Sequence, residues 1–327
     1  MADLSTHCMG LQLANPLVVA SCGFGKTLKG IRSCAEAGAG AIVLKSLFEE
    51  QIRTETAGLE HQSWLSGHAE AFDYVRRMGM ALGPKEYLKL IEEAKKAVPI
   101  PIIASLNCIS AEWWIEYAQQ VELAGADALE LNASILPSDA DRQPDEVEDL
   151  YYEILDEVKS RVTIPVALKI GPYFTSLANF SRTLDERGIS ALVLFNRFYQ
   201  LDIDVEAMEL SSGYQFSSPS ELGQTLRWIA LLAGRLDCDL VASTGVHDGA
   251  GVIKLLLAGA SAVQLCSTLY LNGLEQIGRI LEEIERWMKQ HYFSSLEEFK
   301  GTLSQDTSNR PELYERLQYI KAMAGEE

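Results

Sequence analysis

The stretch AEAGAGAIVLKS (residues 35–46) contains a complete connection from a helix to a strand, and it decides the fold of this chain. Its first half ends in glycine, which closes a helix at little cost because it adopts a left-handed backbone freely. Its second half is an almost continuous apolar run, which is typical of a parallel strand buried on both faces. The same pattern returns in ELAGADALELNAS (122–134), ERGISALVLFNR (186–197) and LAGASAVQLCST (257–268).

Four further apolar runs of this kind lie between the repeats: LVVASCG (17–23), PIIASLN (101–107), PVALKIG (165–171) and DLVASTG (239–245). Eight strands, separated or followed by amphipathic helical segments, predict an α/β fold of the (β/α)8 TIM barrel type. The alternative is a doubly wound sheet, which carries a G-x-G-x-x-G turn after its first strand. The stretch SCGFG (21–25) does not match that turn, so the barrel is favoured.

The residues outside the eight units are expected to cover the ends of the barrel. Residues 1–16, with Gly10 near their turn, predict an N-terminal hairpin over the barrel floor, and residues 271–327 predict a C-terminal helical tail. Insertions at roughly 48–83 and 198–218 are expected to form large loops over the mouth. Because no linker or low-complexity stretch interrupts the chain, residues 1–327 are expected to form a single domain.

The composition allows a large core and restricts the partners. The chain of 327 residues is 47% hydrophobic and carries a net charge of −18, which repels nucleic acid and anionic membranes. It has no apolar run of the roughly 20 residues that cross a bilayer. The start MADLSTHCMGLQLAN (1–15) does not resemble a signal peptide, so a cytoplasmic protein is expected. Six scattered cysteines without a C-x-x-C pair argue against structural zinc and a disulfide framework.

The carboxyl ends of the strands carry the chemistry of a TIM barrel. In this chain those ends offer hydroxyls, amides, two lysines and small residues: Ser21, Lys45, Ser46, Asn107, Asn132, Ser134, Lys169, Asn196, Arg197, Ser243, Thr244, Gly245, Cys266, Ser267 and Thr268. Carboxylates are almost absent there, which argues against metal-dependent hydrolysis and glycosidase chemistry. The lining suits a planar, polar, anionic ligand, and no metal site is expected.

Lys45 and Lys169 leave two interpretations open. Each follows several apolar strand residues, so neither is expected to be an ordinary surface charge. Either suits the Schiff-base lysine of an aldolase or lyase, and both suit fixed cations that hold negative charge on a flavin or substrate. Residues 243–245 and 266–268 end the last two strands and predict a phosphate site. Cys22 and Cys266 are typical of small buried side chains.

Together these motifs resemble the dihydroorotate dehydrogenase family, whose members are FMN-containing (β/α)8 enzymes. LQLANPLVVASCGFG (11–25) resembles the family's G-x-x-x-x-N-P-x-x-x-A-S-G, and GAGAIVLKS (38–46) resembles its GAGAIVTKS. PIIASLN (101–107) with YAQQVELAGADALELNAS (117–134) resembles P-x-I-x-S-I … A-D-x-x-E-x-N-x-S. IPVALKIGPY (164–173) resembles P-V-x-V-K-L-x-P. The resemblance extends from about residue 4 to residue 300.

The resemblance implies an oxidoreductase that moves a hydride between FMN and a CH–CH bond next to a carbonyl of a small anionic substrate. Lys45 is implied as catalytic, between flavin and substrate, and Lys169 as the cation beside the flavin's N1–C2=O edge. Asn132 and Asn196, with Lys45, are implied to bind the substrate. The implied FMN contacts are Ala20, Ser21, Lys45, Ser46, Asn132, Lys169, Ser243, Thr244, Gly245, Cys266 and Ser267. A homodimer and a place in pyrimidine biosynthesis are also implied, whereas an electron-transfer partner is not identified.

The chain departs from the family where the family's catalytic base stands. The motif N-x-S-C/S-P-N reads NASILP (132–137), so Ile135 occupies the base position and Pro137 replaces a substrate-binding Asn. An alkyl side chain accepts no proton, and Ser134 is the candidate replacement. The family's N-x-x-G-L-P-N loop is also replaced, by HAEAFDYVRRMGMALGPKEY (68–87).

The sequence therefore predicts a dihydroorotate dehydrogenase-like enzyme that keeps the flavin half of its site and alters the substrate half. Dihydroorotate is expected to be a poor substrate, because a lost base costs about 10²–10⁴ in rate. Two alternatives stay open: a Schiff-base lyase or aldolase that uses Lys45 or Lys169, and a non-catalytic flavin-binding paralogue.

Overall fold

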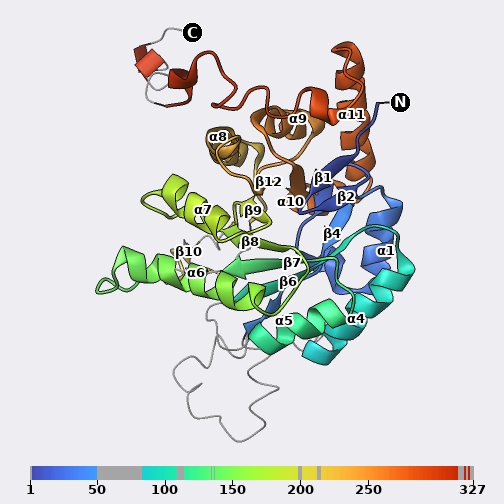
Figure 1. The fold of residues 1–327 in the computed structure, drawn as a ribbon, viewed down its shortest axis with the longest axis vertical. Coiled ribbons are helices and arrows are strands. Elements are labelled where there is room, and N and C mark those ends of the chain that lie inside the picture. Colours follow the sequence, from blue (N-terminus) through green and yellow to red (C-terminus); the bar gives the residue numbers. More distant parts are fainter. Residues whose placement is uncertain are drawn as a thin grey trace, which may run out of the picture.

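The computed structural model describes residues 2–49, 83–108, 114–133, 135, 137–197, 201–211, 215–315, 320–321 and 323–324. Its centre is a closed barrel of parallel strands surrounded by helices (Figure 1), so the predicted (β/α)8 fold is confirmed. The barrel strands are β3 (Leu17–Val19), β4 (Ala41–Val43), β6 (Ile102–Cys108), β7 (Ala128–Ala133), β8 (Val166–Ile170), β9 (Ala191–Leu194), β12 (Asp239–Ser243) and β13 (Ala262–Leu265). Each of the eight runs identified in the sequence overlaps one of them.

The strands pair in sequence order around the barrel, and the pairing of the last strand, β13, with the first, β3, closes it. β13 pairs with β3 through Leu265 and Val19, and β4 pairs with β6 through Ile42 and Ile102. The short strand β5 (Leu47–Phe48) adds to the carboxyl end of β6. Because all eight strands are parallel, their carboxyl ends meet at one mouth.

In each of the four repeats, the glycine that ends the helix has the left-handed backbone that the pattern predicts. The φ angles of Gly38, Gly125, Gly188 and Gly259 lie between 75° and 116°. The helices that cover the barrel are α1 (Leu28–Glu36), α4 (Pro84–Ala97), α5 (Trp114–Leu123), α6 (Pro144–Lys159), α7 (Leu177–Glu186), α8 (Leu222–Leu232) and α9 (Gly249–Ala258). None of the described helices is both long and apolar enough to cross a bilayer.

The predicted N-terminal hairpin closes the floor of the barrel. Strands β1 (Thr6–Cys8) and β2 (Leu11–Leu13) are antiparallel, and Met9 and Gly10 turn between them with φ angles of 55° and 69°. The Met9 amide donates to the Asp239 carboxylate at 2.7 Å, which fixes the turn against the start of β12. Cys8, Met9 and Leu13 pack into the lumen, among small and branched residues from the strands.

The C-terminal residues are helical only in part. Helices α10 (Ser267–Asn272) and α11 (Gln276–Gln290) follow the last strand. Beyond them the chain runs across α8 and α9, where Gly301 and Leu303 donate backbone hydrogen bonds to Leu256 and Leu257. Among its described residues, this segment forms two short 3-10 helices, η5 (Leu296–Glu298) and η6 (Pro311–Tyr314), and residues 320–321 and 323–324 are helical.

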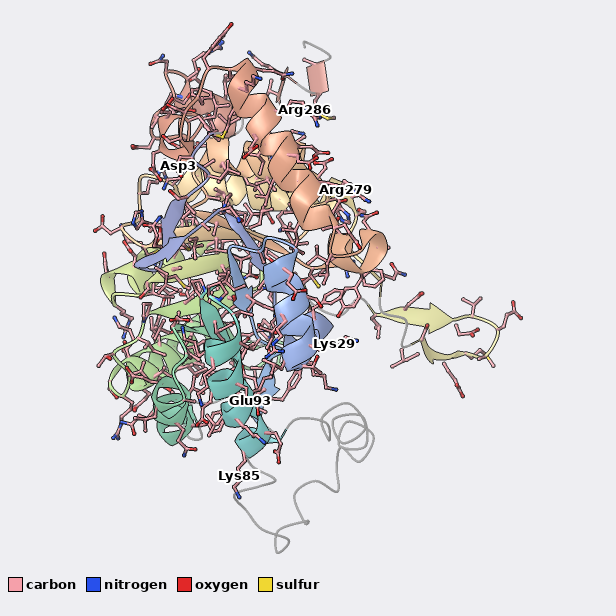
Figure 2. The ribbon with its side chains drawn as sticks, turned by 90° about the vertical axis from the view of Figure 1, so that its right-hand side faces the viewer. Asp3, Lys29, Lys85, Glu93, Arg279 and Arg286 are labelled. Atoms are coloured by element: carbon pink, nitrogen blue, oxygen red, sulfur yellow. The ribbon has the colours of Figure 1, made fainter. Side chains whose placement is uncertain are left out.

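Of the two predicted insertions, most of 48–83 lies outside the described residues. The second forms an exposed hairpin of β10 (Asp202–Asp204) and β11 (Glu209–Ser211), which stands out from the barrel (Figure 2). The chain then returns to α8 through the 3-10 helix η4 (Pro219–Glu221).

Candidate functional site

A ladder of hydroxyls joins the first three barrel strands at the mouth. Ser46 donates its backbone N–H to Ser21 Oγ at 2.8 Å, and the two hydroxyls lie 2.9 Å apart. Ser46 Oγ lies 2.8 Å from Ser105 Oγ on β6. The Tyr87 hydroxyl from α4 accepts from the Ser105 amide at 2.8 Å, which anchors the ladder to a buried aromatic side chain. Ala20, just before Ser21, is bound to Leu265 through its backbone N–H at 2.9 Å.

The two amides predicted to bind substrate lie together. Asn196, which follows β9, donates its side-chain amide to Asn132 Oδ1 on β7 at 2.8 Å. The Asn196 backbone N–H donates to Ile170 O at 2.7 Å, so its position depends on β8 as well. Asn132 is in register with Lys169. The structure therefore gathers Asn132, Asn196 and Lys169 on three neighbouring strands.

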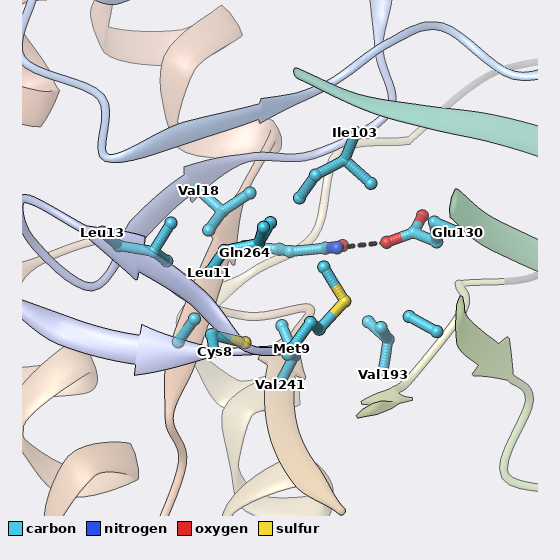
Figure 3. A pocket seen from close by; sticks show the side chains of 12 residues that line it. Cys8, Met9, Leu11, Leu13, Val18, Ile103, Glu130, Val193, Val241 and Gln264 are labelled. Atoms are coloured by element: carbon cyan, nitrogen blue, oxygen red, sulfur yellow. Dashed lines mark hydrogen bonds between the residues drawn. The ribbon is translucent and has the colours of Figure 1, made fainter. Parts of the chain in front are cut away.

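Lys169 is held from inside the barrel by a chain of polar side chains. Its ammonium donates to Gln264 Oε1 at 2.7 Å, and Gln264 Nε2 donates in turn to Glu130 Oε2. Lys169 is 7% exposed and Glu130 only 1%. Figure 3 shows the Gln264 side chain extending to the Glu130 carboxylate across the lumen. The amide has one workable orientation, because a flipped Gln264 would place its NH₂ group against the ammonium.

A small cavity lies next to the hydrogen-bonded side chains of Gln264 and Glu130. Its volume is about 10 Å³, and it is bounded by Met9 and Leu13 of the hairpin, by apolar strand residues, and by Glu130 and Gln264. Glu130 Oε1 has no hydrogen-bond partner among the described residues. The cavity is about as large as one water molecule.

Lys45 stands half-buried at the end of β4. Its ammonium lies 5.5 Å from the centre of the Phe48 ring. Burial lowers the pKa of the Lys45 amine below its usual value, while the nearby thiols of Cys22 and Cys266 oppose that shift. The environment thus favours the neutral amine more than water does.

The ends of β12 and β13 combine hydroxyls with an unusual backbone. Thr244 has a φ of 79°, a conformation that costs a non-glycine residue about 1–3 kcal/mol and concentrates at functional sites. Its hydroxyl donates to Phe195 O at 3.1 Å. Gly245 follows with a φ of 77°, and a Cβ there would lie 2.3 Å from the Leu222 amide nitrogen. Ser267 Oγ accepts from the Ser217 amide at 3.0 Å.

Ile135, at the family's base position, belongs to the apolar layer outside the barrel. It is 9% exposed and packs in the core between the strands and the surrounding helices. With Pro137 it lines a small apolar cavity against Tyr151 of α6 and Phe174. The Tyr151 hydroxyl forms a hydrogen bond with the Ile135 backbone. Ser134, the predicted replacement base, lies outside the described residues.

Three polar residues at the site were missed by the sequence analysis: Ser105, Ser217 and Gln264. Ser105 and Gln264 each interrupt an apolar strand run, and that interruption is the signal that would have found them. Within the described ranges no group of three or more His, Cys, Asp or Glu side chains is placed to bind a metal ion.

Comparison with known proteins agrees with this arrangement. The family model described as "Dihydroorotate dehydrogenase" matches residues 3–288. The chain is 26% identical over 310 residues to the catalytic subunit of dihydroorotate dehydrogenase B (NAD(+)) from Thermoplasma acidophilum, with 92% of this chain and 99% of that protein covered. It is 28% identical to the corresponding subunit from Methanothermobacter thermautotrophicus, with 91% and 97% covered.

A relative named for a different activity matches about as well. The chloroplastic dihydropyrimidine dehydrogenase (NADP(+)) of Arabidopsis thaliana is 26% identical over 340 residues, with 96% of this chain and 80% of that protein covered. Because the family model covers most of the chain, including every barrel strand, the chain belongs to the dihydroorotate dehydrogenase family.

Proposed function

We propose that this protein is an FMN-dependent oxidoreductase that acts on a CH–CH bond next to a carbonyl of a small anionic substrate. The observation that carries the proposal is Lys169, a nearly buried cation held at the carboxyl end of β8 by Gln264. A fixed cation in that place suits a ligand that gains negative charge during the reaction. Family membership supports the same class of chemistry.

The residues at the mouth fit FMN by their chemistry. Hydroxyls and amides dominate the lining, and two lysines supply positive charge for an anionic group. The strained Thr244 and the tightly packed Gly245 shape the end of β12, where barrels often bind phosphate. The residues proposed to hold FMN are Ala20, Ser21, Lys45, Ser46, Asn132, Lys169, Ser243, Thr244, Gly245, Cys266 and Ser267.

When bound, FMN would supply the hydride acceptor and a ring whose reduced form is anionic. The residues of the protein would bind and orient the flavin and the substrate. Lys169 holds its charge in one position because Gln264 fixes its ammonium. Asn132 and Asn196 fix each other's orientation, so their remaining donors and acceptors are arranged before a substrate arrives. Lys45 lies nearby as a second cation that is partly shielded from water.

The substrate of this enzyme is proposed to differ from dihydroorotate. Ile135 carries no proton acceptor, and its side chain packs into the apolar layer against α6. When a CH–CH bond is oxidised, a hydride leaves one carbon and a proton leaves its neighbour, so a base must accept the proton. Without a base at position 135, another residue or the substrate itself must accept it. The related protein named as a dihydropyrimidine dehydrogenase points to reduced pyrimidines as a class to test.

One observation favours a second candidate function. The lowered pKa of Lys45 makes its amine a better nucleophile, as a Schiff-base lyase or aldolase requires. Borohydride trapping distinguishes the two: a lyase incubated with a carbonyl substrate and borohydride gains, on Lys45 or Lys169, the mass of the substrate minus the water lost in forming the Schiff base and plus the two hydrogens of its reduction. The oxidoreductase gains none. A non-catalytic paralogue would bind FMN and show no substrate-dependent loss of flavin colour.

The decisive experiment begins with the purified protein's absorbance spectrum and the identity of any released flavin. FMN is expected to copurify or to bind on reconstitution. Anaerobic addition of dihydropyrimidines and related acids is then expected to bleach the flavin for at least one compound. A folded, colourless protein that takes up no FMN would refute the proposal, and a yellow protein that no compound bleaches would leave the non-catalytic paralogue in its place.

Four further expectations stay predictions. A single domain predicts one cooperative unfolding transition for residues 1–327. A homodimer predicts a sedimentation coefficient above that of a 36.1 kDa monomer at micromolar concentration. A cytoplasmic location stays a proposal from the sequence, and a place in pyrimidine biosynthesis stays a proposal from family resemblance. No electron-transfer partner is identified.

A further inference from the structure

Two cysteines that are far apart in the sequence meet at the mouth of the barrel. Cys22 follows β3 and Cys266 follows β13, and these two strands are paired, with Val19 opposite Leu265. A backbone hydrogen bond of 2.9 Å from Ala20 to Leu265 holds the strand ends together just before both cysteines. Just beyond both cysteines, the Gly23 backbone N–H donates to the Tyr270 hydroxyl at 2.7 Å, so the two free thiols lie near each other.

The surroundings of the pair make one of its thiols acidic. The hydrogen bond from Cys266 lowers the pKa of the Cys22 thiol to about 7, against the opposing effect of burial. Backbone groups of Phe24 and Gly25 hydrogen-bond the same sulfur, and the Lys45 ammonium adds a favourable charge. The pKa of Cys266 is raised, because its proton is the one shared with Cys22. Cys22 is thus the more acidic thiol of the pair and the one that forms the thiolate.

Three other cysteines serve as an internal comparison. Burial raises the pKa of Cys34 to about 12, and it raises the pKa of Cys8 and of Cys238 as well. These three have the environment of inert structural cysteines. Cys22 is buried, as the sequence predicted for a small side chain that fills space in the core. Filling space does not by itself explain why a second thiol lies beside it.

We propose that Cys22 and Cys266 are a dithiol that hydroperoxides oxidise reversibly to an intramolecular disulfide. The assignment is carried by the paired strand ends, by the hydrogen bonds that join them on either side of the two cysteines, and by the nearness of the two thiols to each other and to Lys45. A hydroperoxide is the fitting oxidant because Cys22 is only 5% exposed, which admits a small molecule more readily than a protein disulfide. Cys266 is partly exposed.

The chemistry balances in two steps. The Cys22 thiolate attacks one peroxide oxygen, the O–O bond breaks, and Cys22 becomes a sulfenic acid while hydroxide leaves. Cys266 sulfur then attacks the Cys22 sulfur, the S–O bond breaks, and the leaving hydroxide takes the Cys266 proton as water. For hydrogen peroxide the sum is two thiols and one peroxide giving one disulfide and two waters. An external thiol reverses the reaction by exchange.

The disulfide would lie between two residues of the proposed FMN site. Ser21 precedes Cys22 and Ser267 follows Cys266, so the bond would constrain both strand ends at once. Oxidation also removes the Cys22 charge that supports the ammonium of Lys45. These consequences rest on the proposed function, whereas the disulfide itself does not.

The test is peptide mass spectrometry of the full-length protein after limited treatment with hydrogen peroxide and alkylation of the remaining thiols. The expected product is a linkage between the tryptic peptide 1–26 and the tryptic peptide 255–279, which dithiothreitol abolishes. Peptide 1–26 also contains Cys8, so the Cys8→Ala variant is the matched control and must keep the linkage. Cys22→Ser must lose it.

Failure of the linkage in folded wild-type protein, or its survival in Cys22→Ser, overturns the proposal. An independent readout is the pH dependence of iodoacetamide labelling at Cys22. The groups that face this sulfur are Cys266, Tyr270, Cys34, Lys45 and the backbone of residues 24–25. Half-maximal labelling near pH 7 in wild type, and at a higher pH in Cys266→Ser, supports the pair. A midpoint near pH 9 in both refutes it.

Discussion

Lys169 on β8 donates a 2.7 Å hydrogen bond to Oε1 of Gln264 on β13, a strand that does not neighbour β8 in the barrel. The bond therefore crosses the lumen rather than following the sheet. The Nε2 group of Gln264 in turn donates a hydrogen bond to Glu130. One neutral amide therefore lies between a buried ammonium and a buried carboxylate and forms a hydrogen bond with each. This arrangement gives each of two buried charged groups one hydrogen-bond partner in an otherwise apolar lumen.

Replacing Gln264 by leucine is expected to destabilise the protein. Lys169 and Glu130 would each lose a buried partner, and stranding a buried charge costs about 3–5 kcal/mol. The measurement is the free energy of unfolding from urea titration. Wild-type stability in this variant would show that water replaces the amide without loss.

The exchange variant Gln264→Glu with Glu130→Gln is the matched control. It keeps both side-chain lengths, lets the carboxylate at position 264 accept from Lys169, and lets the amide at position 130 donate to that carboxylate. We expect this variant to recover most of the stability lost in Gln264→Leu. Equal destabilisation of the two variants would contradict the role given to the hydrogen-bonded chain.

Lys45→Met is expected to stabilise the FMN-free protein while weakening FMN binding. Burial lowers the folded-state pKa of Lys45 below the unfolded value of 10.5, so folding disfavours its charged form. The unfolded state therefore binds more protons between the two values, and wild-type stability rises with pH across that window. The stability gap between the variant and wild type should shrink as pH approaches 10.5.

Thermal unfolding of both FMN-free proteins between pH 7 and pH 10.5 measures that gap. If the gap widens with pH, the charge of Lys45 stabilises the folded wild-type protein, which would contradict the prediction.

Gly245→Ala is expected to destabilise the protein and to impair FMN binding. The new Cβ would lie 2.3 Å from the Leu222 amide nitrogen, and the φ of 77° disfavours any side chain. The clash is with the protein's own α8, so the loss appears in unfolding experiments without FMN, at about 1–3 kcal/mol.

The matched control is Gly278→Ala within α11. A Cβ there meets nothing within 4 Å, and alanine stabilises a helix interior by about 0.5–1 kcal/mol relative to glycine. Opposite signs for the two substitutions are the expected result. Equal effects would refute the packing argument at Gly245.

Dihydroorotate is expected to reduce the flavin slowly, about 10²–10⁴ times more slowly than an enzyme with its base in place. Stopped-flow absorbance under anaerobic single-turnover conditions measures the rate. Ile135→Cys is expected to recover little, because residue 135 faces Tyr151 and Phe174 in the apolar layer and a thiol there would be buried with it. Rapid reduction by the wild type, at tens per second on the usual enzyme scale, would show that another residue supplies the base.

The sequence by itself determined the eight strand-and-helix units and the mouth that they share. Glycines that end helices and apolar runs that form buried strands are local signals, so AEAGAGAIVLKS (35–46) predicts its strand without knowledge of the rest. The N-terminal hairpin followed from the same kind of signal at Gly10. Because parallel strand ends meet at one edge, the pattern also placed Lys45, Asn132 and Lys169 together.

Only the tertiary structure decided which side chains touch. Gln264 meets Glu130 and Cys266 meets Cys22 because the barrel closes, and closure joins residues that no local pattern connects. The direction of Ile135 likewise depends on how the chain leaves β7 and packs on α6. Periodicity assigns side chains to a face only within a strand, so beyond its end the surrounding packing determines whether a residue faces the mouth or the apolar layer.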